Sequence, residues 1–212
     1  SIAKQVVVLR EPDRVGEQMA SALAVAISGR PGPVVVVLPD DKLGLESGSR
    51  AVAPTPLSSP APAQASMNTL GVLLAGAERP MLMLGGPLWT ASNKALAEQV
   101  AVQLGLPVVT SWRRKDRFDN AHPNYAGELG LGANPELVKA VKSADLLLVL
   151  GARLTENATQ GYGLFDQDFA ARALVHVCGD AEALGRCWQP RLAVHAAVGP
   201  TLWALAKLPA QR

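Results

Sequence analysis

Residues 144–153 read Ala-Asp-Leu-Leu-Leu-Val-Leu-Gly-Ala-Arg, and this stretch decides the fold. The five aliphatic residues at 146–150 show no alternation with polar residues, so both faces of the strand that they predict must be buried. Strands of this kind are typical of parallel sheets that carry helices on both sides. The Gly-Ala-Arg that follows would lie at the carboxyl end of the strand, where ligands bind in such sheets.

Similar apolar runs recur on both sides of this strand and alternate with helical patterns. Helices are expected at 67–77, along the stripe of Leu96, Val100 and Leu104, from Asn134-Pro135 to about 142, after Asp180, and over 200–208. The remaining strands are expected at 81–84, 106–110, 173–178 and 192–194. This alternation predicts an α/β fold, a doubly wound, Rossmann-like parallel sheet that occupies residues 67–209.

The first 41 residues predict a separate strand-helix-strand appendage. An apolar strand at 6–9 leads to a helix that Asp13 can cap and Gly29 can end, and a valine-rich strand follows at 34–38. The second strand lacks polar alternation, which favours burial on both faces. Without the rest of a sheet it would present an apolar edge, so we expect it to be disordered, to dock on the second block, or to pair with a neighbouring chain.

The two blocks are joined by a segment of different character. Residues 42–66 are rich in proline, alanine and serine and show little periodicity, which predicts an extended linker. Its prolines include Pro54, Pro56, Pro60 and Pro62.

Composition excludes several classes of function. The 212 residues are 49% hydrophobic with a net charge of +2, and the chain has neither a long basic run nor the aromatic content that base stacking needs, so no nucleic acid partner is expected. No apolar stretch approaches the length of a membrane span and no signal-peptide pattern opens the chain, so we expect a cytoplasmic protein without a membrane partner. Cys178 and Cys187 are expected to be buried packing residues.

The predicted strand ends supply the candidate binding residues. Gly85 and Gly86 lie between a strand and a helix, where they could admit a phosphate or simply form a tight turn. Gly151 and Arg153 follow the central strand, and the guanidinium could bind an anion or pair with Glu156 or Asp180. Asp180 follows the strand at 173–178, where it could accept ribose hydroxyls or cap a helix.

The chain carries no recognisable catalytic constellation. Its three histidines, His122, His176 and His195, lack acidic or cysteine neighbours at metal spacing, and neither a nucleophile elbow nor a Walker loop is present. The loop that contains Trp112, Arg113 and His122 is expected to be solvated, with the indole folded down; contact with an anion or a partner subunit is the alternative.

Several stretches resemble thiamine-diphosphate-dependent enzymes of the acetolactate synthase group. Residues 28–41, Ser-Gly-Arg-Pro-Gly-Pro-Val-Val-Val-Val-Leu-Pro-Asp-Asp, look like the segment that closes the pyrimidine-binding domain of that group. Glu78-Arg79-Pro80, Gly85-Gly86, the stretch 122–127, the stretch 144–154 and the stretch 176–180 look like its central domain. The resemblance covers nearly the whole chain.

The resemblance implies a parent enzyme of three domains, which is expected to be a homo-oligomer. Thiamine diphosphate and Mg would lie between the pyrimidine-binding and diphosphate-binding domains, where a 2-oxo acid is decarboxylated and joined to a carbonyl acceptor. The activating glutamate would precede this sequence, and the Gly-Asp-Gly motif of the metal–diphosphate site does not occur in it. We therefore expect a non-catalytic fragment with a structural role in assembly, whose partners are the missing domains of the same polypeptide.

Central domains of this group bind FAD, ADP or neither. Leu154-Thr155-Glu156-Asn157 replaces the Phe-Asp and arginine of FAD-binding members, and Trp112-Arg113 replaces a small, glycine-containing loop. These differences argue against tightly bound FAD and leave open a weaker adenine nucleotide at Gly85, Gly86, Arg153 and Asp180. Two alternatives remain: a functional FAD- or ADP-binding module, and a stand-alone NAD-dependent enzyme that would need an exposed His176 or His195 at a strand end.

Overall fold

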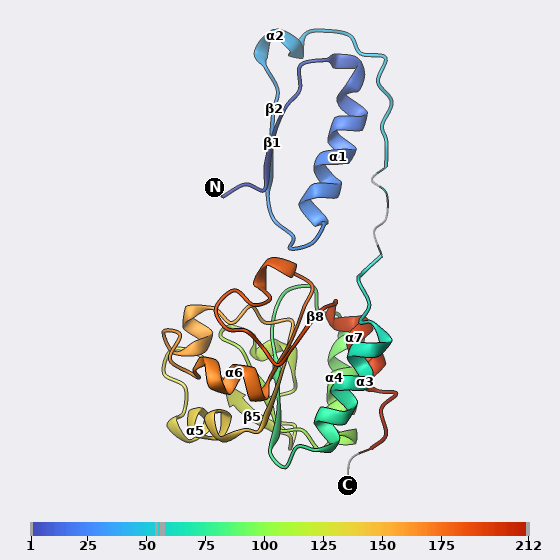
Figure 1. Ribbon diagram of the computed structural model, residues 1–212. Coiled ribbons are helices and arrows are strands. Elements are labelled where there is room, and N and C mark those ends of the chain that lie inside the picture. Colours follow the sequence, from blue (N-terminus) through green and yellow to red (C-terminus); the bar gives the residue numbers. More distant parts are fainter. Residues whose placement is uncertain (1, 54, 56–57, 211–212) are drawn as a thin grey trace. The chain divides into compact units, whose positions relative to one another are not determined.

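A computed structural model of the chain describes residues 2–53, 55 and 58–210. The chain forms two compact units, residues 1–58 and residues 59–212 (Figure 1). Pro54 and Pro56 of the expected linker lie outside the described residues. The described residues between Gly44 and Ala63 contain neither helix nor strand.

The first unit is the strand-helix-strand arrangement that the sequence predicts. Strand β1 (Gln5–Val8) and strand β2 (Val34–Val37) pair in parallel, with Gln5 opposite Val34. Between them lie a 3-10 turn, η1 (Pro12–Arg14), and helix α1 (Val15–Ile27), and a one-turn helix, α2 (Asp40–Leu43), follows β2.

Three expectations for this unit need correction. Asp13 does not cap α1, because its carboxylate accepts a hydrogen bond from the Gly48 amide at 2.8 Å. β2 is a regular strand paired with β1, so disorder, one of the three alternatives for this strand, is wrong. The expectation that both faces of β2 are buried is also wrong within the unit, since Val35 and Val37 are exposed. Gly29 does end α1, with a φ of +51°.

The second unit is a doubly wound α/β domain, as predicted. Its six parallel strands have the order β5-β4-β3-β6-β7-β8. They are β3 (Pro80–Leu84), β4 (Val108–Thr110), β5 (Tyr125–Glu128), β6 (Leu146–Leu150), β7 (Leu174–Cys178) and β8 (Leu192–His195). The helices are α3 (Gln64–Ala75), α4 (Ala91–Gln103), α5 (Pro135–Ser143), α6 (Gln167–Ala173) and α7 (Val198–Leu205), with 3-10 turns η2 (Lys115–Arg117), η3 (Glu156–Thr159) and η4 (Ala181–Ala183).

Some of these elements differ from the sequence prediction. Strand β5 lies in a segment expected to be a loop, and helix α6 was not predicted. The helix expected after Asp180 is only the 3-10 turn η4. Helix α3 begins at Gln64, within the stretch assigned to the linker.

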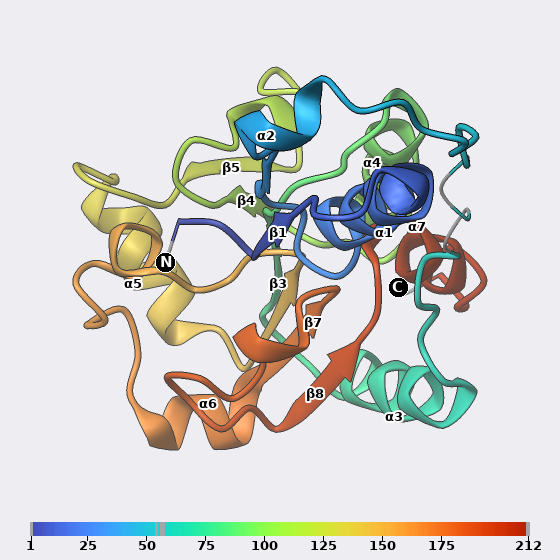
Figure 2. The same cartoon turned by 90° about the horizontal axis from the view of Figure 1, so that it is seen from above.

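Two hydrophobic layers cover the sheet, one on each face. Helices α3, α4 and α7 lie on one side, and α5 and α6 lie on the other (Figures 1 and 2). The two layers divide the side chains of β6 by alternation: Leu146, Leu148 and Leu150 join the first layer, whereas Leu147 and Val149 join the second. This alternation explains why the central strand tolerates no polar residue.

Asp145 joins the amino ends of the two central strands. Its carboxylate accepts hydrogen bonds from the backbone amides of Glu78 and Arg79, at 2.8 and 2.9 Å, just before β3. Burial alone would raise the pKa of Asp145, but these two amides outweigh it and the pKa lies below its usual value. No helix among the described residues is long and apolar enough to cross a membrane.

Candidate functional site

The candidate site lies where the two central strands of the second unit end. After β3 the chain continues to β4 and β5 on one side, and β6 starts the other half of the sheet. The carboxyl ends of β3 and β6 are therefore neighbours at the reversal of strand order, which is where sheets of this kind bind ligands. The Gly85 amide donates to the Leu150 carbonyl at 3.0 Å, so the predicted glycine positions are brought together.

The three glycines at this point pack against one another. A Cβ built on Gly86 would lie 2.2 Å from the Gly151 carbonyl oxygen, and a Cβ on Gly151 would lie 2.6 Å from that of Gly85. Gly86 and Gly151 also have φ angles of +81° and +79°, a region that favours glycine. The contact between the two strand ends is thus sufficient to explain the glycines.

Ser111 is a residue of this site that the sequence analysis missed. It follows β4, it is buried, and its hydroxyl lies 2.5 Å from the position that a Cβ on Gly85 would occupy. Its place directly after a predicted strand was the signal that could have found it. The Gly85 carbonyl is also occupied, because the indole Nε1 of Trp89 donates to it at 2.8 Å.

Arg153 and Asp180 form an ion pair across the ends of β6 and β7. Arg153 Nε lies 3.3 Å from Asp180 Oδ2, and both side chains are largely buried. The other carboxylate oxygen of Asp180 accepts from the Glu182 amide at 3.2 Å and so caps η4. Arg153 Nε nevertheless makes no hydrogen bond of good geometry among the described residues, although it is buried.

The two cysteines behave differently from each other. Cys178, at the end of β7, is buried as expected, and burial raises the pKa of its thiol. Cys187 is exposed, so the expectation that it packs in the core is wrong. It lies in the connection between η4 and β8, where the short 3-10 turn replaces the predicted helix.

Each of the three histidine rings contacts a backbone group of the second unit. His176 is buried, with its Nε2 2.7 Å from the Ala152 carbonyl oxygen. His195 is exposed at the end of the edge strand β8, with its Nε2 3.3 Å from the Gly179 carbonyl oxygen. His122 accepts a hydrogen bond from the Asn124 amide through Nδ1. The described part of the chain contains no group of three His, Cys, Asp or Glu residues that could hold a metal ion.

Burial lowers the pKa of His176, which predicts a pH dependence of stability. The unfolded chain binds a proton at His176 more readily than the folded chain does. The contribution of neutral His176 to stability is therefore fully present above the ordinary pKa of 6.5 and is lost as the pH falls below it. We expect His176→Gln to reduce this loss between about pH 7.5 and pH 5.5, and His195→Gln to leave it unchanged. The unfolding temperature of each variant is measured at both pH values. The same decrease in unfolding temperature for the two variants would contradict the expectation.

The polar loop after β4 folds against the domain. Trp112 is partly buried and contacts the second hydrophobic layer, and the Arg113 guanidinium lies 4.5 Å from its ring centre. A Cβ on Gly130 would lie 2.5 Å from the Trp112 ring. The Arg113 amide donates to Glu128 of β5 at 2.7 Å. The folded-down indole is therefore the correct interpretation of this loop.

The fold and the site together define a Rossmann-like domain with glycine, arginine and aspartate at the switch in strand order. Residues 68–205 match the family model for the central domain of thiamine pyrophosphate enzymes, and the chain belongs to this family. It is 30% identical to acetolactate synthase isozyme 1 large subunit of Escherichia coli over 98% of the chain and 36% of that protein. It is 32% identical to acetolactate synthase large subunit of Parasynechococcus marenigrum over 100% of the chain and 35% of that protein.

Solved structures agree with this assignment. A thiamine diphosphate-dependent 4-hydroxybenzoylformate decarboxylase from Rhodococcus jostii has a TM-score of 0.74 and 25% identity, over 99% of this chain and 40% of that one. A putative thiamin diphosphate-dependent enzyme from Mycobacterium smegmatis shares the fold, with a TM-score of 0.78 at 23% identity over 98% of this chain and 39% of that one. The chain thus spans little more than a third of the length of the relatives it matches.

Proposed function

We propose that this chain is a non-catalytic structural part of a thiamine-diphosphate-dependent enzyme resembling acetolactate synthase. In this proposal residues 67–209 are the central domain, residues 1–41 close the pyrimidine-binding domain, and residues 42–66 link them. The parent would be a cytoplasmic homo-oligomer in which other domains decarboxylate a 2-oxo acid and join the product to a carbonyl acceptor. The similarity to acetolactate synthases along nearly the whole chain supports this assignment.

The observation that carries the proposal is that the groups at the switch point are used by the protein itself. Gly85, Gly86 and Gly151 are needed for the contact between β3 and β6, and Arg153 is paired with Asp180. An enzyme site needs groups that are free to act on a substrate. The polar groups at this rim instead hold the strand ends together, which suits a domain that serves assembly.

The sequence lacks the Gly-Asp-Gly motif of the metal–diphosphate site that the family resemblance implies for the parent enzyme. We therefore assign the thiamine diphosphate and Mg of the parent to its other domains, and derive no catalytic step from this chain.

A second function is favoured by one observation, the buried Arg153 Nε that lacks a hydrogen bond. This Nε lies 3.3 Å from Asp180 Oδ2 without a hydrogen bond of good geometry, so the ion pair leaves one donor that a phosphate could use. We therefore keep a weak adenine nucleotide, ADP or FAD, as the alternative ligand at Gly85, Gly86, Gly151, Arg153 and Asp180. Because Gly85, Gly86 and Gly151 pack closely against one another, a diphosphate has less access to their backbone amides than it would have in a glycine turn without such contacts. We therefore expect weak binding.

The NAD-dependent alternative has less support. It requires an exposed histidine at a strand end, and His176 is buried against the Ala152 carbonyl. His195 is exposed, but β7 separates its strand from β6, where the nicotinamide crevice would lie. We therefore do not propose this activity.

The structural role and the nucleotide site are tested with the same purified chain. We expect no acetolactate from pyruvate in the presence of thiamine diphosphate and Mg²⁺, and no saturable uptake of that cofactor in calorimetry. Product formation at a rate proportional to protein concentration, or saturable cofactor binding, would refute the structural role.

The nucleotide site is tested by titrating ADP into the original chain and two variants. We expect weak, saturable binding that Arg153→Gln reduces about tenfold, because a charged hydrogen bond to phosphate is lost. Arg30→Gln is the matched control, since Arg30 is exposed and belongs to the first unit. Equal affinities of the two variants would remove the nucleotide site and leave the structural proposal standing.

A further inference from the structure

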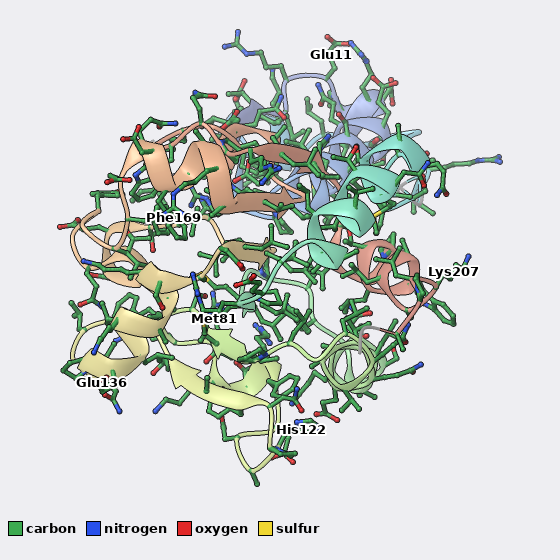
Figure 3. The ribbon with its side chains drawn as sticks, turned by 60° about the horizontal axis from the view of Figure 1, so that its bottom comes forward. Glu11, Met81, His122, Glu136, Phe169 and Lys207 are labelled. Atoms are coloured by element: carbon green, nitrogen blue, oxygen red, sulfur yellow. The ribbon has the colours of Figure 1, made fainter. Side chains whose placement is uncertain are left out.

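An aromatic groove lies on the second unit, on the side of the sheet covered by α5 and α6. It has a volume of about 500 Å³. Its lining comes from the last turn of α5, the segment before α6, α6 itself and the segment before β8, and includes Lys142, Tyr162, Phe165, Phe169, Arg172 and Trp188. Figure 3 labels Phe169 on α6. None of these residues belongs to the strand-end site described above.

Four aromatic rings form the apolar part of the groove. Trp188 contacts Phe165 with ring centres 4.6 Å apart and Tyr162 with ring centres 6.0 Å apart, both at tilted angles. Phe165 stacks on Phe169 at 5.0 Å. Trp188, Phe165 and Phe169 are buried, whereas Tyr162 is 45% exposed. The buried rings are thus joined to one exposed ring that a planar ligand can reach.

The backbone holds Tyr162 at this position against its own preference. Gln160, Gly161 and Tyr162 have φ angles of +54°, +67° and +63°, so two residues with side chains adopt the left-handed region. Such conformations cost free energy and persist only where the surrounding structure enforces them, often at binding sites. The Gln160 side-chain amide donates to the Gly130 carbonyl and anchors this turn.

The charged groups of the groove are mainly cationic. Lys142 and Arg172 are exposed and have no acidic partner within 4 Å among the described residues. The Arg172 guanidinium lies 5.3 Å from the Phe169 ring centre, which keeps it beside the aromatic rings. Asp166 also lines the groove and opposes an anion, but its Oδ1 accepts a hydrogen bond from the Phe169 amide at 2.8 Å.

We propose that this groove binds a small planar aromatic anion. An aromatic ring of the ligand would lie against Tyr162, and its carboxylate or phosphate would pair with Lys142 and Arg172. The volume is in the range of small-molecule sites, roughly 300–1,000 Å³. An aromatic carboxylate and a nucleoside monophosphate share this chemistry, and separate titrations distinguish them.

The proposal is tested by calorimetric titration of the full chain with 2-naphthoate. We expect saturable binding, and binding about fivefold weaker for the neutral 2-naphthalenemethanol and for the non-aromatic cyclohexanecarboxylate. AMP is the second probe: tighter binding of AMP that Arg153→Gln leaves unchanged identifies a phosphate ligand of the groove, and tighter binding of 2-naphthoate identifies a carboxylate. Absence of saturable binding by both anions, or equal affinity for the neutral alcohol, would overturn the proposal.

Variants place the ligand in the groove. We expect Tyr162→Gly to weaken 2-naphthoate binding about fivefold, and Lys142→Gln and Arg172→Gln to weaken it about threefold each. Lys139→Gln is the matched control on α5, because Lys139 is exposed and absent from the lining. Arg153→Gln should also have no effect, which separates this groove from the strand-end site. Unchanged affinity in Tyr162→Gly would overturn the placement.

Folding of the key variant is checked independently. Tyr162→Gly removes an exposed ring but relieves a left-handed φ, so its unfolding temperature should stay within about 3 °C of the original chain. If the variant unfolds at a much lower temperature, Lys142→Gln and Arg172→Gln decide the question, since both side chains are exposed. Unchanged 2-naphthoate affinity in both would then overturn the proposal.

Discussion

The Gly86→Ala substitution is expected to destabilise the second unit by about 3 kcal/mol or more, because it adds backbone strain and a backbone clash at one position. The φ of Gly86 is +81°, and its new Cβ would lie 2.2 Å from the Gly151 carbonyl oxygen. That oxygen belongs to the backbone at the end of the central strand, so it cannot move aside as a flexible side chain would. The two strand ends must separate to admit the methyl group.

Gly132→Ala is the matched control for this prediction. Gly132 has a similar φ of +74°, but a Cβ there would meet nothing within 4 Å. It should therefore cost only the conformational strain, about 1 kcal/mol. All four tryptophans of the chain lie in residues 59–212, so tryptophan fluorescence during urea unfolding reports on the second unit. Similar losses of stability in the two variants would show that the clash at Gly86 is relieved and the strand ends are not tightly joined.

The sequence predicted five strands of the second unit, including the edge strand β8, and missed the edge strand β5 and the short helix α6. β3, β6 and β7 are runs of aliphatic residues whose burial leaves little choice of structure. β5 reads Tyr-Ala-Gly-Glu, and as an edge strand it is only partly buried, so no apolar run identifies it. Helix α6 has just seven residues, too few to show a clear helical period.

The residues placed at the candidate site were predicted from the sequence except Ser111, but their contacts were not. The position of each residue after a strand was enough to place Gly85, Gly151, Arg153 and Asp180 at one edge of the sheet. The sequence left open whether Arg153 binds an anion or pairs with an acidic residue, and the structure shows the pair with Asp180. The reason for the glycines was also hidden, because a contact between backbones that are 65 residues apart leaves no local pattern.

The valine-rich strands of the first unit are less buried in that unit than their sequence predicts. Its valines predict burial on both faces, yet in the unit itself α1 supplies contacts to one face and Val6, Val8, Val35 and Val37 remain exposed on the other. In a parallel pair these four side chains share one face, because residues two apart point the same way. That the strand at 34–38 docks on the second block or pairs with a neighbouring chain stays a prediction.

The central strand gives the second large effect, since Leu148→Ala is expected to cost the second unit about 3–4 kcal/mol. Leu148 is 0% exposed and lies opposite Leu82 of β3 and Val175 of β7. Because strands pair with β6 on both sides and the first hydrophobic layer covers it, the surrounding residues cannot collapse into the space left by the lost carbons. The loss therefore includes both the transfer free energy and a cavity.

Leu131→Ala removes the same atoms from a site that is 73% exposed, so it should change stability by no more than about 0.5 kcal/mol. Urea unfolding followed by tryptophan fluorescence compares the two variants within one unit. Folded Leu148→Ala should keep its affinity for ADP and 2-naphthoate, because the Leu148 side chain lines neither site. Both affinities should fall only under conditions in which part of the protein is unfolded. If Leu148→Ala lost as little stability as Leu131→Ala, β6 would not be held rigidly between β3 and β7. The contact between the strand ends at Gly86 and Gly151 would then lack the support on which it depends.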